Sequence, residues 1–263
     1  MHFNRIRILG LALVAVFAMS VVAVSAASAA APEFKSASEE CYKLTSKTGN
    51  YENSTCTTVQ AKHEGEFEKR PKKHKFTDKE ATSRFIATSS KGVLIVFTCT
   101  ADTSKGEITG AKTTAGVTVT FTGCTAKEGT KECSANSKGE PAGTIKTNGL
   151  KDMLGTVAAT EAPNTGVGDA LEPEGKEGFV TLEAACVELT KIQVLGSVIG
   201  EVKPVNVMQA TGELIFACEP PGSEKQKIQK FVGVAKDTLS YFGNPACFES
   251  KDEITFEEPI EVT

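Results

Sequence analysis

Val117-Thr118-Val119-Thr120-Phe121-Thr122 is the stretch that decides the fold class. Apolar and hydroxyl side chains alternate along it with a period of two residues, and every residue is β-branched or aromatic. Successive side chains of a strand point to opposite faces of a sheet. The alternation therefore predicts a strand with one face in the core and the other toward solvent.

Two further segments carry a strand pattern. Val93 to Phe97 is apolar at every position, which predicts a central strand covered on both faces. Segment 254–262 has its apolar side chains on one parity, at Ile254, Phe256, Ile260 and Val262. Pro259 falls on the other parity and predicts an edge position or a bulge, because proline donates no backbone hydrogen bond.

Short strand candidates fill much of the remaining chain, at residues 143–147, 155–159, 179–184, 191–195, 197–202, 213–217 and 230–234. Glycines and turn dipeptides such as Asn148-Gly149 separate them. Many short strands with no helical periodicity between them predict an all-β fold, either an antiparallel sandwich or a barrel.

The N-terminal third differs from this pattern. Residues 62–80 are rich in charge and include Lys69-Arg70-Pro71-Lys72-Lys73-His74-Lys75, which predicts a solvated arm or a long loop. The capping box Thr77-x-x-Glu80 before Ala81 to Phe85 predicts one short helix. We therefore expect an N-terminal segment, residues 30–90, packed on a β-rich body, residues 91–263, within a single mature globular domain.

Residues 1–29 have the layout of a cleavable signal peptide. Basic residues precede the apolar run 8–24, small residues follow it, and Ala27-x-Ala29 predicts cleavage before Ala30. No later apolar run is as long, so we expect a secreted, extracytoplasmic protein with no membrane span in the mature chain. Cleavage removes two of 29 basic residues and none of 33 acidic ones, which leaves a mature net charge of −6. This mild acidity gives no reason to expect nucleic acid as a partner.

All eight cysteines lie beyond the signal segment, at Cys41, Cys56, Cys99, Cys124, Cys133, Cys186, Cys218 and Cys247. An even number outside a reducing cytosol predicts four disulfides. The chain has no Cys-x-x-Cys and keeps only two histidines after cleavage, so we expect no metal site.

Sequence alone does not choose the disulfide pairing. Proximity along the chain favours Cys41 with Cys56, Cys124 with Cys133, and Cys218 with Cys247. Cys99 and Cys186 would then form the fourth pair; each of them ends an apolar run, as residues of neighbouring or facing strands would.

Several short segments resemble a group of exported, β-rich actinobacterial proteins that are uncharacterised. They are residues 106–110, 121–124, 196–200 with 204–206, and 257–261. The resemblance spans roughly Tyr42 to Val262. It implies export and implies no activity.

No residue set predicts a catalytic site or a cofactor site. His63 and His74 lie in the charged arm, where we interpret both as solvated surface histidines. Asp102-Thr103-Ser104 lacks the glycine of an aspartic-protease loop, and we interpret it as an Asx turn. Asn53-Ser54-Thr55 matches a glycosylation acceptor.

Two functional hypotheses remain. We favour a non-catalytic extracytoplasmic domain that is binding or structural, at the cell envelope or outside it, with an envelope polymer or another exported protein as its partner. The basic arm Lys69 to Lys75 is its one visible contact surface. The alternative is a secreted hydrolase that uses paired carboxylates, because the chain has 33 acidic residues. Sugar binding is disfavoured, since the chain has no Trp and only three Tyr.

Overall fold

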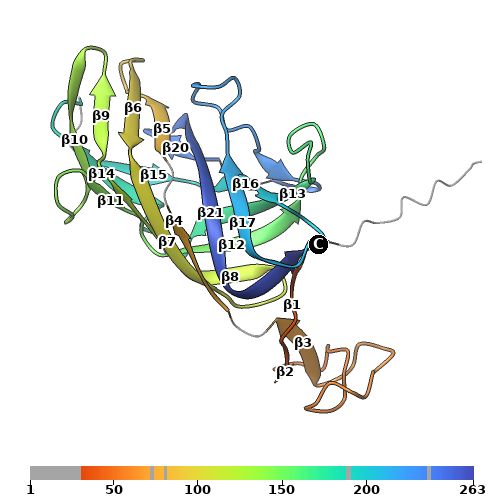
Figure 1. Cartoon of the computed structure of the whole chain (residues 1–263). Coiled ribbons are helices and arrows are strands. Elements are labelled where there is room, and N and C mark those ends of the chain that lie inside the picture. Colours follow the sequence, from red (N-terminus) through yellow and green to blue (C-terminus); the bar gives the residue numbers. More distant parts are fainter. Residues whose placement is uncertain (1–30, 72–73, 80–81, 188–190, 236–237) are drawn as a thin grey trace, which may run out of the picture. The chain divides into compact units, whose positions relative to one another are not determined.

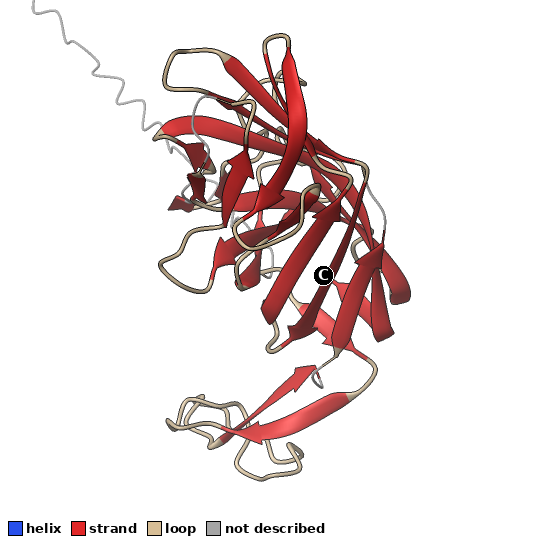
Figure 2. Ribbon diagram, turned by 90° about the vertical axis from the view of Figure 1, so that its left-hand side faces the viewer, coloured by secondary structure: helices blue, strands red, loops and turns tan. Residues whose placement is uncertain are grey.

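The alternating segment around Phe121 is part of strand β8 (Thr113–Thr122), in which Val117 and Phe121 are buried. A computed structural model describes residues 31–71, 74–79, 82–187, 191–235 and 238–263. All regular secondary structure in these ranges is strand (Figure 2). The prediction of an all-β fold is thus confirmed.

Eight strands close into an antiparallel barrel, namely β4 (Lys75–Lys79), β7 (Ala101–Ile108), β8, β12 (Leu150–Thr156), β13 (Val167–Pro173), β16 (Val198–Lys203), β17 (Gln209–Phe216) and β21 (Asn244–Val262). Each strand pairs with the next, and β21 pairs back with β4 (Figure 1). The order around the barrel follows the order along the chain. The fold is therefore an up-and-down barrel, in which every interior edge is paired.

The connections that follow β4, β8, β13 and β17 contain additional strands. These are β5 (Ser83–Thr88), β6 (Leu94–Cys99), β9 (Thr125–Glu128), β10 (Lys131–Ser137), β11 (Thr144–Lys146), β14 (Val180–Ala184), β15 (Ile192–Leu195), β18 (Lys230–Phe231), β19 (Val234–Ala235) and β20 (Ser240–Tyr241). These four are every second connection between consecutive barrel strands. Because neighbouring strands of the barrel alternate in direction, all four leave the barrel at the same end.

The additional strands close a second circuit of backbone pairing. From the first residues of β21 it runs through β5, β6, β9, β10, β14, β15 and β20 and returns to β21. Its interior contains the rings of Phe85, Phe97 and Tyr241, whose centroids lie 6.0–6.4 Å apart. Strand β21 belongs to both circuits, and the buried residues of the two circuits form one continuous core.

Strand β6 is central, as its apolar sequence predicts. It pairs with β5 on one edge and with β9 on the other. Ile95 and Phe97 are buried in the main core, and Val96 packs on the opposite side against Ile86 and Cys247.

The C-terminal strand also behaves as predicted. Apolar side chains of one parity, among them Ile260 and Val262, face the core. Gln209 pairs with Ile260 whereas Thr211 pairs with Thr255, so the register shifts across the segment that holds Pro259. The bulge predicted from Pro259 is confirmed.

The short helix predicted at residues 77–85 is wrong. Thr77 lies in β4 and Phe85 lies in β5, while residues 80–81 are outside the described part of the chain. In β4, Phe76 and Asp78 are buried and Thr77 is exposed, which is the period of a strand. Backbone pairing of β4 with both β21 and β7 supplies more stabilisation than a local capping box does.

The predicted charged arm is likewise not a long loop. Its residues form β3 (Phe67–Pro71), which pairs with β2 (Glu39–Lys43), and then β4 of the barrel. Lys72 and Lys73 lie outside the described residues. Among the short candidates, 155–159 is misplaced, because the strand there is β12 and ends at Thr156; candidate 230–234 forms the two short strands β18 and β19.

Four disulfides are formed. Cys41 pairs with Cys56 and Cys218 with Cys247, as proximity predicts. The other two predicted pairs, Cys124 with Cys133 and Cys99 with Cys186, are wrong. The structure joins Cys99 to Cys124 and Cys133 to Cys186 instead.

Strand register explains the exchange of partners. Thr98 of β6 lies opposite Thr125 of β9, so Cys99 faces Cys124 one step further along the same pair, with their Cα atoms 4.0 Å apart. Ala135 of β10 lies opposite Ala184 of β14, which places Cys133 level with Cys186 in the same register. Four disulfides indicate an oxidising environment. The described residues contain no helix that is long and apolar enough to cross a membrane.

Peptide mapping tests this connectivity. Proteolysis without reduction is expected to give one cross-linked peptide pair that contains Cys99 and Cys124 and another that contains Cys133 and Cys186. Mass spectrometry before and after reduction identifies them. A peptide pair linking Cys124 to Cys133 would contradict the register of β9 and β10, in which Cys133 lies opposite Ala126.

Candidate functional site

The barrel encloses a cavity of about 80 Å³. All eight barrel strands contribute to its wall, together with β1 (Phe34–Ser36). Most lining side chains are apolar, among them Val119, Leu171 and Phe216. Eight-stranded barrels have interiors that side chains fill or that hold one small ligand, and the described interior leaves part of the space open.

One end of this cavity reaches the surface. Val207, in the loop between β16 and β17, lines the cavity and is nevertheless 46% exposed. On the same side, β1 pairs with the end of β21, with Phe34 opposite Val262, and the buried Phe34 side chain also lines the cavity. The cavity therefore opens to the surface beside this loop.

A second void, of about 50 Å³, lies within the outer circuit. Phe121, Phe179 and Phe248 line both spaces and separate them. The rings of Phe121 and Phe248 meet edge to face with centroids 5.7 Å apart. The described residues that line this second void include no charged side chain, so the ionisable groups of the interior belong to the barrel cavity.

Two buried carboxyl groups meet on the cavity wall. Asp152 of β12 pairs with Leu171 of β13, and Leu154 pairs with Asp169, so the two acids are diagonal neighbours on the inner face. Both are 6% exposed. Oδ1 of Asp152, Oδ1 of Asp169 and the hydroxyl of Thr114 have no hydrogen-bond partner among the described residues.

This environment favours the neutral form of the pair. Burial raises the pKa of Asp152 to about 6, and the nearby Thr114 and Asp169 limit the rise. Burial and then the charge of Asp152 raise the pKa of Asp169 well above its ordinary value. Two carboxyl groups this close do not both ionise readily, so the pair retains a proton near neutral pH.

A second acidic group lies across the barrel, on β4, β7 and β21. Burial raises the pKa of Asp252 to about 8, with a further contribution from the charge of Asp102. Burial also raises the pKa of Asp78, which accepts a hydrogen bond from the backbone N–H of Ser104. The hydroxyl of Ser250 donates to Asp252.

Positive charge is scarce in the same cavity. Lys203 is the one basic residue among the described lining residues, and its ammonium lies 3.5 Å from a carboxylate oxygen of Glu201. The cavity is therefore apolar in its walls and acidic in its polar groups. No cluster of three metal-ligating side chains is found in the described part of the chain.

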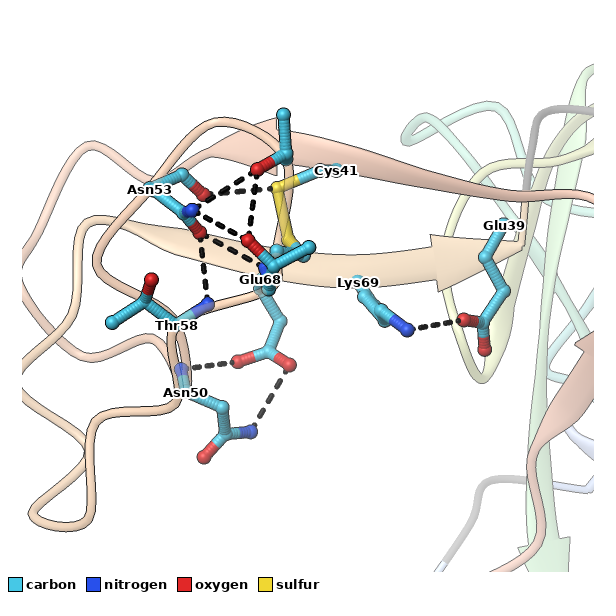
Figure 3. Close-up of a disulfide and its surroundings, with 10 residues drawn as sticks. Glu39, Cys41, Asn50, Asn53, Thr58, Glu68 and Lys69 are labelled. Carbon is cyan, nitrogen blue, oxygen red and sulfur yellow. Dashed lines mark hydrogen bonds and ion pairs between the residues drawn. A yellow bond between two sulfur atoms is a disulfide. The ribbon is translucent and has the colours of Figure 1, made fainter.

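The N-terminal hairpin of β2 and β3 is organised around the Cys41–Cys56 disulfide and Asn53 (Figure 3). The Asn53 side-chain amide donates to the hydroxyls of Thr55 and Thr57, and its Oδ1 accepts from the backbone N–H groups of Thr57 and Thr58. The asparagine of the predicted glycosylation acceptor thus serves to close its own loop.

Two cations of the basic arm, Lys69 and Arg70, are each paired with a glutamate. The Lys69 ammonium lies 3.2 Å from Glu39, as Figure 3 shows, and Arg70 donates to Glu40 over 2.6 Å. Register explains both pairs, because Arg70 lies opposite Glu40, and Glu39 is two residues from Cys41, the residue opposite Lys69, which makes Glu39 a diagonal neighbour of Lys69. Lys69 and Arg70 therefore face glutamates of the same hairpin, whereas Lys75 lies exposed in β4.

The interpretation of His74 as a surface residue is wrong, whereas His63 is exposed. His74 is 2% exposed, and its Nε2 lies 3.0 Å from the Ser36 hydroxyl. Glu258 approaches the same nitrogen at 3.9 Å. A catalytic triad needs the acid at the other ring nitrogen. His74 therefore ties β1 to the barrel and does not form a triad.

The interpretation of Asp102-Thr103-Ser104 as an Asx turn is also wrong. All three residues lie within β7, where Asp102 is 2% exposed. The buried acids of the cavity were missed by sequence reasoning. A signal was present, because Asp152 has the same parity as Leu150 and Leu154, so a carboxyl group occupies a core position.

Fold and site together define a class: a disulfide-bonded, up-and-down antiparallel barrel with an apolar cavity that contains buried acids. No protein-family model, curated protein or solved structure matches the chain. The cavity itself is therefore the basis for inferring a function.

Proposed function

We propose that this protein is an exported, non-catalytic binding protein that holds a small apolar molecule inside its barrel. The proposal rests on the cavity, which is a largely apolar space inside the barrel, open at one end, with a few buried polar groups in its wall. That combination is typical of small-molecule sites, where apolar walls supply affinity and few polar groups supply orientation.

Export is supported by two independent features. Residues 1–29 have the layout of a signal peptide, and the four disulfides fit an oxidising compartment. The resemblance to exported actinobacterial proteins points the same way. Because Lys69 and Arg70 of the basic arm are paired with glutamates, an envelope polymer is a weaker proposal for the partner than a cavity ligand.

Filling the cavity tests the proposal. Val119→Phe adds an aromatic ring to a side chain that lines the space. We expect it to weaken binding of small apolar compounds more than tenfold in calorimetric titrations, because the ring occupies the ligand volume. Thr118→Phe is the matched control, since residue 118 has the opposite parity on β8. Equal binding by both variants and the original protein would place the ligand elsewhere.

One observation favours a second candidate, a hydrolase that uses Asp152 and Asp169. The two carboxyl groups are diagonal neighbours and both have raised pKa values, as in sites where one acid donates a proton and its neighbour accepts one. An activity screen over peptides, esters and glycans tests it. Turnover that disappears in Asp169→Asn would favour the hydrolase; its absence in the original protein would reject it.

A further inference from the structure

We propose that the barrel cavity takes a small apolar amine, bound as the ammonium ion by Asp152 and Asp169. This inference rests on the proposed function and specifies the class of its ligand. It follows from three properties of the cavity: its unpartnered acceptors, its charge and its size.

The unpartnered groups call for a donor. Asp152 and Asp169 are each at least nine-tenths buried and line the cavity, and each has a carboxyl oxygen, Oδ1, without a partner in the described structure; the Thr114 hydroxyl lies beside Asp152. Buried polar atoms are normally satisfied. An ammonium group has three N–H donors and no acceptor, so it matches two carboxyl groups that are diagonal neighbours on one wall of the cavity.

The charge of the interior selects a cation. Asp78, Asp102 and Asp252 are buried on the strands across the barrel from the pair, and Thr114 on β8 is uncharged. Lys203, the one basic side chain of the described lining, has Glu201 beside it. In the empty cavity burial favours the neutral form of these acids, and an ammonium ion beside them favours their ionised form, whereas a carboxylate ligand would oppose that ionisation. Fatty acids and other anionic amphiphiles are thereby disfavoured.

Size and wall composition limit the rest of the ligand. An apolar cavity of about 150 Å³ holds a benzene ring, so a cavity of about 80 Å³ admits a short alkyl chain, or a single ring that extends into the open end beside Val207. The walls around the acids are aliphatic and aromatic. Cyclohexylamine is a suitable probe. Cyclohexanol and cyclohexanecarboxylate have the same ring and differ only in the polar group.

Amine binding is coupled to proton release. The empty pair retains a proton near neutral pH, and an ammonium ion favours the ionised carboxylates, so binding sends a proton to the buffer. Affinity for the amine should therefore rise as the pH increases through about 6 and beyond. It should fall again near the amine's own pKa of about 10. Affinity for cyclohexanol should change little over this range.

Calorimetric titration of the full mature protein with the three probes at pH 8 tests the inference. We expect cyclohexylamine to bind at least tenfold more tightly than cyclohexanol, and cyclohexanecarboxylate to bind weakest. Titrations in buffers of different ionisation enthalpy should show proton release for the amine alone. These measurements need no variant, so they do not depend on a substituted barrel folding.

Variants then locate the selectivity. In the double variant Asp152→Asn with Asp169→Asn, amine affinity should fall to that of the alcohol while alcohol affinity is retained. Glu253→Gln, which removes an exposed acid of β21, is the control and should leave all affinities unchanged. Cyclohexanol that binds as tightly as the amine would overturn the amine inference and leave the proposed function standing. Binding of none of the three probes would overturn both.

Discussion

Replacing Asp252 with Asn is expected to stabilise the protein at pH 8 by several kcal/mol. Burial, with the charge of Asp102, raises the pKa of this carboxyl group from 3.8 to about 8. Each unit of pKa difference between folded and unfolded states corresponds to about 1.4 kcal/mol, so about 6 kcal/mol is the upper bound. Asn has the same shape, is never charged and can still accept the hydrogen bond from Ser250.

The direction of the pH dependence follows from proton uptake. Between pH 3.8 and about 8 the folded protein binds the proton of Asp252 more tightly than the unfolded chain does. The free energy of unfolding therefore falls as the pH rises through this interval and levels off above it. Asp152, with a pKa of about 6, contributes in the same direction up to that pH.

Denaturant unfolding at a series of pH values checks this prediction. The original protein should be most stable toward the acidic end of the interval, and the Asn variant should lose part of that slope. Glu253→Gln serves as the control, because Glu253 is the next residue along the chain and its side chain is exposed. A stability that increases from pH 5 to pH 8 in the original protein would show that these acids are not buried.

Removing the Cys133–Cys186 disulfide, by changing both residues to Ala, is the second large expected effect. The bond closes a loop of 53 residues. In the chain-entropy model such a cross-link contributes about 4 kcal/mol, because it restricts the unfolded state. It also joins β10 to the residues that follow β14, the strand that pairs with β10 in the outer circuit. We expect the midpoint of thermal unfolding to fall and the outer strands to lose hydrogen-exchange protection first.

The Cys41–Cys56 disulfide offers a matched comparison. It is a cross-link within the N-terminal hairpin and closes only 15 residues. Changing both of its cysteines to Ala should loosen the loop around Asn53 and leave the main unfolding transition nearly unchanged. Equal losses of stability in the two double variants would indicate that barrel and hairpin unfold as one cooperative unit.

Local patterns were sufficient for the fold class. The alternation at Val117 to Thr122 and the apolar run at Val93 to Phe97 each identify a strand and its number of buried faces, because side-chain direction in a strand depends only on parity. Pro259 predicts irregular strand pairing for a similar reason, because the absence of a backbone N–H donor is a property of proline itself.

Local patterns misled where a distant strand decided the outcome. A capping box at Thr77 is a real helix signal, yet pairing with β21 and β7 makes the segment a strand. His74 looked solvated because its neighbours in sequence are charged, but β1 covers it through Ser36. Cys124 lies closer in sequence to Cys133 than to Cys99, and strand register nevertheless pairs it with Cys99.

By itself the sequence determined that this chain is built of strands, that its cysteines can pair completely and that its N-terminus has the layout of a signal. These properties depend on residue type and parity, which are local. Tertiary structure alone decided that the strands close into a barrel, which thiols meet, and that Asp152, Asp169 and Asp252 share one apolar interior. Closure and register are set by hydrogen bonds between residues far apart in the chain, and no local pattern specifies which distant strand a given edge will pair with.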